Sequence, residues 1–241
     1  MKTIGLIGGM SWESSIEYYR LINEAVRARL GGLHSARCLL HSVDFAEIEP
    51  LQRLSEWDEA AKQIVAAAQQ VEKGGADFLL LCTNTMHKVA DAIQRGISIP
   101  LLDLADATGQ AVKSRSLKRV WLLGTTVTMN EDFYRGRLSS QHGLEVLVPS
   151  EEDRCTVHRI IYEELCVGCI LDKSRLEYVR IMDRLVERGA EAVILGCTEI
   201  GLLVRQDDSH IPVFDTTRIH AEAAVEYALS GHHRDLEAPP R

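Results

Sequence analysis

The chain has 241 residues, a formal net charge of −8 and a hydrophobic content of 46%, and this length suits one large or two small α/β domains with well-buried cores. Lysine and arginine do not gather into a basic stripe, which argues against a nucleic-acid-binding protein, and no apolar run is long enough to cross a membrane. The six cysteines lack the spacing of a disulfide framework, and the first apolar run begins too early for a signal peptide, so we expect a cytoplasmic protein.

The first part of the chain alternates short apolar runs with amphipathic stretches. The run at 4–7 ends at Gly8-Gly9-Met10, and Ser11-Trp12-Glu13 can then cap and open a helix. Because strands alternate with helices, the sheet is expected to be mostly parallel. Strands are expected at 4–7, 37–43, 78–82 and 101–102, and helices at 11–30, 46–54, 58–73 and from about 84 onward.

The second part of the chain repeats this alternation. An apolar run at 119–123 leads into Gly124-Thr125 and a helix through Tyr134. After Asp215, an amphipathic helix over about 218–229 is expected to pack back on the first half of the chain. Further strands are expected at 144–147, 193–196 and 213–214, and further helices at 155–165 and 173–188.

Three pairs of similar segments recur along the chain in the same order, with offsets of 112 to 116 residues. This period is too long for a solenoid repeat and suits a duplicated α/β half. The pairs are 75–85 with 189–199, 99–103 with 211–215, and Ile7-Gly8 plus Tyr18 with Leu123-Gly124 plus Tyr134.

The duplication predicts an α/β fold made of two pseudo-symmetric three-layer αβα halves with mostly parallel sheets. We expect the active site in the cleft between them, with Thr83 and Cys197 on opposite walls. The first half is expected at 1–103 plus 216–230, the second at 104–215, and a polar tail at 231–241.

Cys197 follows the apolar run 193–196 where a helix can begin. A cysteine at a helix N-terminus feels a partial positive charge that favours the thiolate, the form that acts as a base or nucleophile. The alternative is a structural cysteine, because free cysteines are among the most buried residues. The recurrence of this segment at 75–85 favours a functional role.

Short polar side chains follow several of the predicted strands. Thr83-Asn84-Thr85, Thr125 with Thr128, and Thr198-Glu199 lie at strand-to-helix turns, where such groups can bind carboxylates together with helix N-terminal amides. Ordinary helix capping explains any one of them. With the loop from Gly8 to Ser11, four such loops at one sheet edge favour a site for an anionic ligand.

Three other motifs suggest chemistry that the rest of the sequence does not support. The Gly5 to Gly9 segment lacks the spacing of a dinucleotide fingerprint. Cys166-Val167-Gly168-Cys169 lacks the second ligand pair of a zinc site and the helix N-terminal setting of a redox motif, so packing is the favoured interpretation. Lys88 permits a Schiff base, but we expect His87 and Lys88 at the surface or rim.

Four segments occur in an order and spacing that resemble the cofactor-independent aspartate/glutamate racemase family, over about residues 2–229. The resemblance implies a two-domain, pseudo-symmetric α/β protein that acts on a small-molecule amino-acid substrate without cofactor or metal, and that forms a homodimer. It also implies a cysteine from each half facing the substrate Cα, one for each enantiomer. The segments are Ile7-Gly8-Gly9-Met10-Ser11-Trp12, Thr83-Asn84-Thr85-Met86-His87, Gly124-Thr125 with Thr128, and Gly196-Cys197-Thr198-Glu199.

The sequence departs from the family pattern at one of the two catalytic positions. The family's first catalytic cysteine aligns with Thr83, and Cys82, one residue earlier, should point away from the site because side chains alternate along a strand. By the resemblance, Cys197 is the base for an L-amino acid, and Thr83 or a water that it positions returns the proton. Some relatives with threonine here act on L-aspartate or L-glutamate. A second departure is Glu199, where glutamate racemases typically have histidine.

We therefore expect a cofactor-independent racemase of L-aspartate or L-glutamate, with Cys197 and Thr83 as catalytic residues. A related single-cysteine isomerase or decarboxylase, a hydantoin racemase, and a non-catalytic protein that binds acidic amino acids remain alternatives. No nucleic-acid or membrane partner is expected. The expected substrate-binding residues are Met10, Gln52, Asn84, Thr85, Thr125, Thr128, Thr198 and Glu199.

Overall fold

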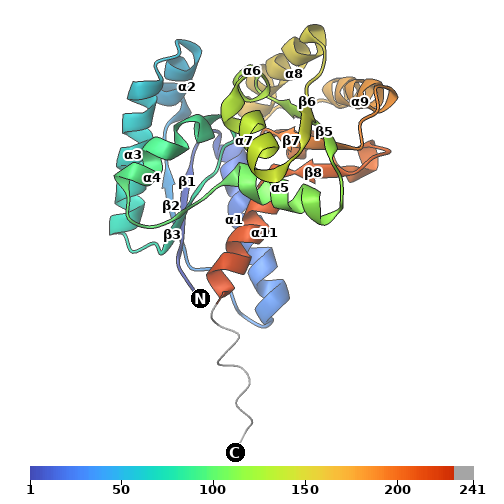
Figure 1. Ribbon diagram of the computed structural model, residues 1–241. Helices are drawn as coiled ribbons and strands as arrows, with labels where there is room; N and C mark the ends of the chain where they lie inside the picture. Colours follow the sequence, from blue (N-terminus) through green and yellow to red (C-terminus); the bar gives the residue numbers. More distant parts are fainter. Residues whose placement is uncertain (231–241) are drawn as a thin grey trace, which may run out of the picture.

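The computed structural model describes residues 1–230 and contains two four-stranded parallel sheets with helices around them (Figure 1). The polar tail expected at 231–241 lies outside the described residues. The predicted α/β class and the two pseudo-symmetric halves are confirmed, because the strand order of the first sheet, β2-β1-β3-β4, recurs in the second as β6-β5-β7-β8. Within residues 1–230, no helix combines the length and apolarity that a membrane span requires.

The first sheet has the strands β1 (Ile4–Gly8), β2 (Cys38–Ser42), β3 (Phe78–Leu81) and β4 (Leu101–Leu102). Side chains from β1 alternate between its two faces: Ile7 packs in the core that includes Ile64, while Ile4 and Leu6 pack in the core that includes Tyr18. Both faces are therefore buried, as the continuous apolar runs predict. The helices between the strands of this first sheet are α1 (Trp12–Leu30), α2 (Phe45–Arg53), α3 (Trp57–Lys73), the 3₁₀ helix η1 (Thr85–Val89) and α4 (Ala90–Gly96).

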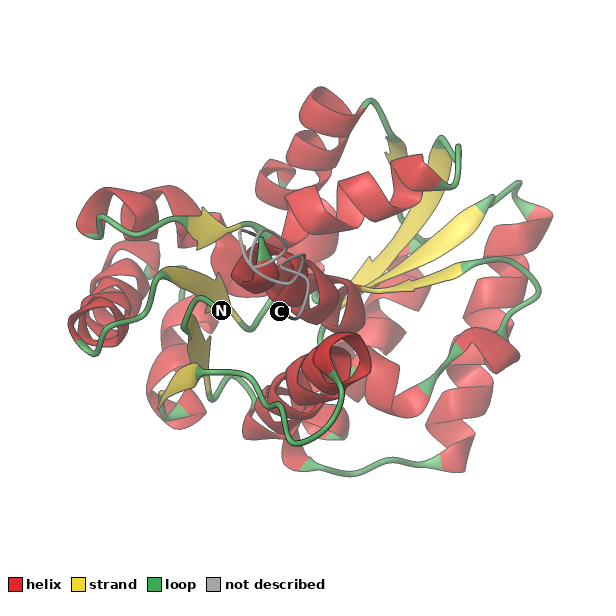
Figure 2. Ribbon diagram, turned by 90° about the horizontal axis from the view of Figure 1, so that it is seen from below, coloured by secondary structure: helices red, strands yellow, loops and turns green. Residues whose placement is uncertain are grey.

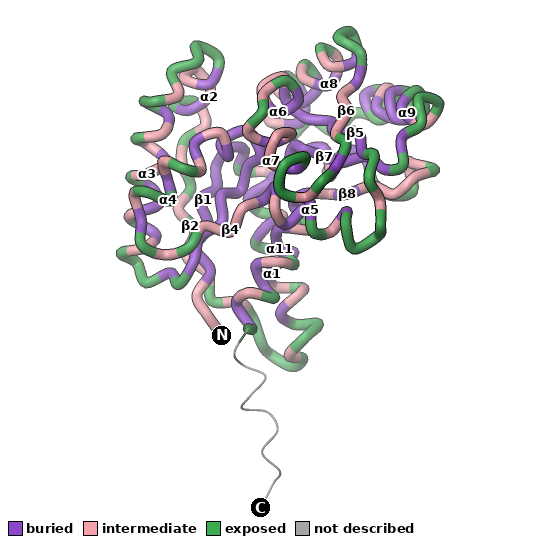
Figure 3. The backbone as a smooth tube through the Cα atoms, viewed as in Figure 1, coloured by how far each residue is buried: buried purple, intermediate pink, exposed green. Residues whose placement is uncertain are grey.

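The second sheet has the strands β5 (Arg119–Gly124), β6 (Glu145–Leu147), β7 (Ala192–Gly196) and β8 (Val213–Asp215). Figure 3 shows burial concentrated along the central strands of the two sheets, with exposed residues on the outer helices and loops. The helices that follow β4 or belong to this half are α5 (Leu104–Ser114), α6 (Thr126–Asn130), α7 (Asp132–His142), α8 (Glu151–Glu163), η2 (Leu165–Val167), α9 (Asp172–Glu187), α10 (Ile200–Leu203) and η3 (Gln206–Asp208).

The recurring Ile-Pro segments end in two equivalent helix caps. The Asp103 carboxylate accepts hydrogen bonds from the backbone N–H groups of Ala105 and Asp106 at the start of α5. The Asp215 carboxylate does the same for Thr217 and Arg218 at the start of α11 (Thr216–Leu229). The duplication therefore places an N-cap at the same point of each half.

Two boundaries differ from the sequence-based prediction for physical reasons. Helix α8 begins at Glu151 and not at 155, because the Ser150 hydroxyl caps it and acidic residues are favourable in a first helical turn. The single helix expected through Tyr134 is two helices, α6 and α7, with extended backbone at Glu131 between them. Both corrections lie in the second half.

Helix α11 packs against α1 and the first sheet, although it follows the last strand of the second sheet. Ala221, Ala224 and Val225 share one buried core with Tyr18 and Ile22 of α1. Viewed from below, the two sheets form separate groups of strands, with the pair of central helices between them (Figure 2). The end of the chain therefore ties the two halves together.

His220 is a buried polar contact of α11 with the first half. Its Nε2 lies 2.9 Å from the Leu102 carbonyl oxygen and its Nδ1 lies 2.9 Å from the Tyr18 hydroxyl. Because a carbonyl only accepts, Nε2 carries the hydrogen and Nδ1 accepts from the tyrosine. Burial, together with the nearby His87, lowers the pKa of His220 to about 3.

The lowered pKa of His220 predicts acid sensitivity. Since the unfolded chain takes up this proton near pH 6.5 and the folded chain only near pH 3, stability is lost as the pH falls from 6.5 toward 3, by about 2 kcal/mol at pH 5. Urea unfolding at pH 7.5 and pH 5 should show this loss. In His220→Gln the part due to this group should vanish, whereas an equal loss in both proteins would contradict the assignment.

Candidate active site

The carboxyl ends of the two sheets face each other, and the loops that follow the strands touch across the junction. The Ser11 loop after β1 contacts Glu199 after β7. The Thr85 hydroxyl after β3 lies 2.9 Å from the Thr125 hydroxyl after β5. The topology thus brings the predicted loops to one place. The residues that these loops contribute are only 0 to 7% exposed: Thr83, Asn84, Thr85, Thr125, Thr128, Cys197, Thr198 and Glu199.

The Glu199 carboxylate is the centre of this junction. Its Oε1 accepts hydrogen bonds from the Ser11 backbone N–H (3.1 Å) and hydroxyl (2.8 Å). Its Oε2 accepts from the Cys197 thiol and the Thr198 hydroxyl, each at 2.9 Å. The expectation that Thr198-Glu199 acts as a donor pair is therefore wrong for Glu199, which is the acceptor for four donors.

The loop between β1 and α1 donates to an anion, and that anion is Glu199. Gly9 lies at φ +94°, where a Cβ would come within 2.1 Å of the Val43 carbonyl oxygen, so only glycine fits. Met10, an expected substrate-binding residue, packs in the apolar core with Ile7 and Ile48. Ser11, which the sequence signalled only as part of this loop, makes the polar contacts.

The surroundings of Cys197 disfavour its thiolate form. Burial raises the pKa of its thiol well above the ordinary value, and the neighbouring Glu199 carboxylate raises it further. The expectation that a helix N-terminus favours the thiolate is therefore not met here. Helix α10 has only four residues and carries a small dipole, whereas a carboxylate accepts a hydrogen bond from the sulfur itself.

Thr83 lies in the loop after β3, the strand that corresponds to the one before Cys197. Its carbonyl oxygen lies 2.7 Å from His87 Nδ1, and His87 Nε2 accepts from the Leu104 backbone N–H at 3.1 Å. Cys82 packs in the apolar core beneath α1 and α11, as the alternation along the strand predicts. His87 is only 6% exposed, so the expectation that it lies at the surface or rim is wrong.

Three threonine hydroxyls form a cluster across the junction. Thr85 lies 2.9 Å from Thr125 and 3.3 Å from Thr128, and Thr125 lies 3.1 Å from Thr128. Thr125 also caps α6 by accepting from the Thr128 backbone N–H. Capping and clustering therefore coexist, and the hydroxyls remain free to reorient toward a ligand.

Asn84 contributes an unpaired acceptor. Its Nδ2 donates to the Thr216 hydroxyl at 3.1 Å, while its Oδ1 is buried without a hydrogen-bond partner among residues 1–230. Because a buried polar atom without a partner is costly, this carbonyl is suited to a donor that a ligand brings. The sequence interpretation treated Asn84 as a donor to carboxylates.

Gln52 reaches the second half through a residue that the sequence interpretation missed. Its Oε1 accepts from the Tyr162 hydroxyl at 3.0 Å. Burial raises the pKa of Tyr162, and the nearby Cys197 and the negative charge of Glu199 add to the rise. Tyr162 therefore lies within electrostatic range of the thiol, on a helix whose local pattern gave no functional signal.

The other motifs do not join this site. Lys88 pairs with Glu131 at 2.5 Å and lies over the Trp57 ring. Cys169 is exposed, so packing does not account for it. Residues 1–230 contain no group of three or more histidine, cysteine or acidic side chains placed to hold a metal ion.

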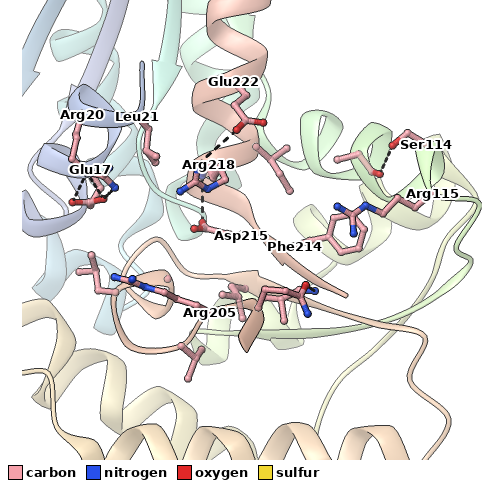
Figure 4. Close-up of a pocket in the computed structure, with 18 of the residues that line it drawn as sticks. Glu17, Arg20, Leu21, Ser114, Arg115, Arg205, Phe214, Asp215, Arg218 and Glu222 are labelled. Carbon is pink, nitrogen blue, oxygen red and sulfur yellow. Dashed lines mark hydrogen bonds and ion pairs between the residues drawn. The ribbon is translucent and has the colours of Figure 1, made fainter. Parts of the chain in front are cut away.

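A cavity of about 940 Å³ (Figure 4) is lined by residues on either side of the Cys197 loop but not by Cys197 itself. Leu195 and Gly201 form part of its wall, and the guanidinium group of Arg115 lies over the Phe214 ring. No expected catalytic or substrate-binding residue lines it. The candidate site is therefore the junction of the strand ends and not this cavity, whose arginines are Arg20, Arg115, Arg205 and Arg218.

Comparison with known proteins agrees with this geometry. The family model described as Asp/Glu/Hydantoin racemase matches residues 7–224. The chain is 54% identical to a crystal structure of a candidate Asp/Glu racemase from Yersinia pestis, over 95% of this chain and 100% of the other, with a TM-score of 0.87. It is 36% identical to an aspartate racemase homologue from Pyrococcus horikoshii, over 95% and 99%, with a TM-score of 0.81. It is 25% identical to the broad specificity amino-acid racemase RacX of Bacillus subtilis, over 72% and 74%.

The contact between Cys197 and Glu199 predicts the reactivity of the thiol. In Glu199→Gln the negative charge beside the sulfur is lost, so the pKa of Cys197 should fall. At pH values below the midpoint of the thiol titration, Cys197 should therefore be alkylated faster in this variant than in the wild type. Iodoacetamide labelling from pH 7 to 10, read for the Cys197 peptide by mass spectrometry, measures this. Glu13→Gln removes a carboxylate that makes no hydrogen bond to Cys197 and is the control. Equal profiles in wild type and Glu199→Gln would contradict the contact.

Proposed function

The chain belongs to the Asp/Glu/Hydantoin racemase family, and we propose that it racemises L-aspartate or L-glutamate without a cofactor, using Cys197 as the base for the L enantiomer. The observation that carries the proposal is the hydrogen bond from the Cys197 thiol to the Glu199 carboxylate. It places an ionisable sulfur beside a proton acceptor at the junction of the two halves. Such a pair can take a proton from carbon and pass a proton on.

The junction supplies groups for each part of an acidic amino acid. The unpaired Asn84 Oδ1 suits the α-ammonium group, because it is a buried acceptor that lacks a donor. The hydroxyls of Thr85, Thr125 and Thr128 suit a carboxylate, because each can turn its hydrogen toward an anion. Donors to the α-carboxylate also stabilise the charge that develops when the α-proton leaves.

The proton path begins at the thiol. The Cys197 proton moves along its hydrogen bond to Glu199 Oε2, the substrate Cα–H bond breaks, and a new S–H bond forms. The carbanion is then protonated from the opposite face, by Thr83 or by a water that Thr83 positions. Exchange with solvent returns each group to its starting state. The Ser11 donors to Oε1 hold the carboxylate in place for the first transfer.

Thermodynamics limits what an unequal pair of residues can do. The two enantiomers have equal free energy, so kcat/KM must be the same in both directions of a true racemisation. A threonine hydroxyl is a much weaker acid than a thiol, and Thr83 can therefore change kcat and KM separately for the two enantiomers. It leaves the equilibrium unchanged.

A second candidate function follows from the single thiol. Cys82 packs in the apolar core, so of the two corresponding loops, after β3 and after β7, only the one after β7 brings a thiol to the junction. A one-thiol decarboxylation or isomerisation needs no second base and is the alternative. Binding of acidic amino acids without turnover is less favoured, because the thiol and its carboxylate partner are both in place.

We further propose that the chain works as a homodimer in a reducing, cytoplasmic compartment. All six thiols are free. Trp12, Ile16 and Tyr19 are 53 to 62% exposed along one face of α1, and the neighbouring loop adds Val167 and Ile170. Exposed large apolar side chains that gather in this way indicate an interface, and a two-fold dimer uses the same patch on both copies.

Catalysis by Cys197 is tested by turnover, measured with chiral chromatography. Cys197→Ser should abolish formation of D-aspartate and D-glutamate from the L forms, because a hydroxyl is too weak an acid to supply the base. Thr83→Cys should raise the turnover of the D substrates, because it restores a thiol on the opposite face. Full activity of Cys197→Ser would contradict the proposed role of Cys197 as the base.

The dimer is tested by sedimentation. Ile16→Glu places a charge in the exposed apolar patch and should shift the protein from dimer to monomer. Leu33→Glu, at a fully exposed residue outside the patch, should leave the dimer intact. A wild-type monomer, or a dimer that Ile16→Glu does not weaken, would contradict the assignment of this surface.

A further inference from the structure

One hydrogen bond joins helices that belong to different halves. The Tyr162 hydroxyl, near the end of α8, donates to Gln52 Oε1, near the end of α2, at 3.0 Å. The two residues are 110 positions apart, and Gln52 is only 6% exposed. The contact therefore joins Tyr162 of the second half to the buried Gln52 side chain of the first half.

The ring of Tyr162 is held on two sides. Phe45 of α2 stacks on it, with ring centroids 6.3 Å apart and an interplanar angle of 22°. In the other contact, the ring centroid of His158 lies 4.7 Å from that of Tyr162. His158 Nδ1 accepts from the Thr126 backbone N–H at 3.2 Å, and burial lowers the pKa of this histidine, which keeps it neutral. The hydroxyl is therefore fixed in direction by packing and by the loop that carries Thr125.

The hydrogen bond also fixes which end of the Gln52 amide is free. Burial raises the pKa of Tyr162, so its hydroxyl stays protonated and donates. With Oε1 occupied, the amide presents its two N–H donors at Nε2, for which residues 1–230 provide no hydrogen-bond acceptor. Two N–H donors match the two oxygens of a carboxylate.

We propose that Tyr162 is a positioning residue that orients the Gln52 amide so that its Nε2 donates to the side-chain carboxylate of the substrate. The pair thereby sets a preference for acidic over amide side chains, because an amide substrate would bring its own N–H donors to the same place. This inference rests on the proposed function, since it needs an acidic amino acid in the site. It adds a role for a side chain that touches Gln52 and not the reacting atoms.

Tyr162→Phe tests the role, because it keeps the ring stack and removes only the hydroxyl. The KM for L-aspartate and L-glutamate should rise about tenfold with kcat within about twofold, since the lost contact helps binding and not proton transfer. Gln52→Ala should have the same effect, and the double variant should be no worse than Gln52→Ala alone. Tyr227→Phe, whose ring packs on Phe78 in the first half, is the control and should leave KM unchanged.

Calorimetry distinguishes positioning from a general loosening of the site. In Tyr162→Phe the Kd for L-aspartate should rise about tenfold, whereas the Kd for L-asparagine should change less than about twofold. Gln52→Glu keeps an oxygen that can accept from Tyr162 but places a negative charge beside the substrate. It should lose binding of L-aspartate and retain that of L-asparagine.

The outcomes separate this inference from the proposed function. If wild-type protein turns over no acidic amino acid, the proposed function fails and this inference fails with it. If wild-type protein is active and Tyr162→Phe leaves KM unchanged, or weakens L-aspartate and L-asparagine equally, only the role of Tyr162 is overturned. Should Tyr162→Phe not fold, as judged by circular dichroism, the two Gln52 variants decide: equal losses for both ligands would overturn the inference.

Discussion

The site depends on one buried negative charge. The Glu199 carboxylate accepts from Ser11 of the first half through one oxygen and from Cys197 and Thr198 of the second half through the other. A buried carboxylate is tolerated only when its oxygens are hydrogen-bonded, so the two halves must meet in one register for this charge to be stable. The same contact that stabilises the fold at the junction thus places a proton acceptor beside the thiol.

This arrangement explains why the thiol is protonated and still usable. Burial and the adjacent carboxylate both raise the pKa of Cys197, so the thiolate is not the resting form. A proton that leaves along the hydrogen bond moves to Glu199 Oε2, so the thiolate that forms stays hydrogen-bonded to the protonated carboxyl group. An amino-acid substrate carries an α-ammonium group, and this positive charge favours the thiolate where it lies near the sulfur. The resting structure and the proposed reaction are therefore consistent.

Local sequence pattern predicted the strands, the duplication and the loops that carry Thr83 and Cys197, because buried parallel strands are continuous apolar runs that end at glycine or polar residues. It did not predict the partners of those loops. Ser11 and Glu199 are 188 residues apart, and Gln52 and Tyr162 are 110 apart, so only the packing of the halves brings them together. The burial of His87 was missed for the same reason, since its contacts come from the packing of α5 against its own short helix.

The measurement that tests this account most directly is proton NMR of wild-type protein with L-aspartate, and separately with L-glutamate, in heavy water without added cofactor. We expect loss of the α-proton signal as Cys197 exchanges that proton with solvent, together with the appearance of the D enantiomer. Exchange without inversion would mean that the Cys197 side works and the Thr83 side does not complete the turnover. An α-proton signal that persists with both acidic amino acids would contradict the central claim.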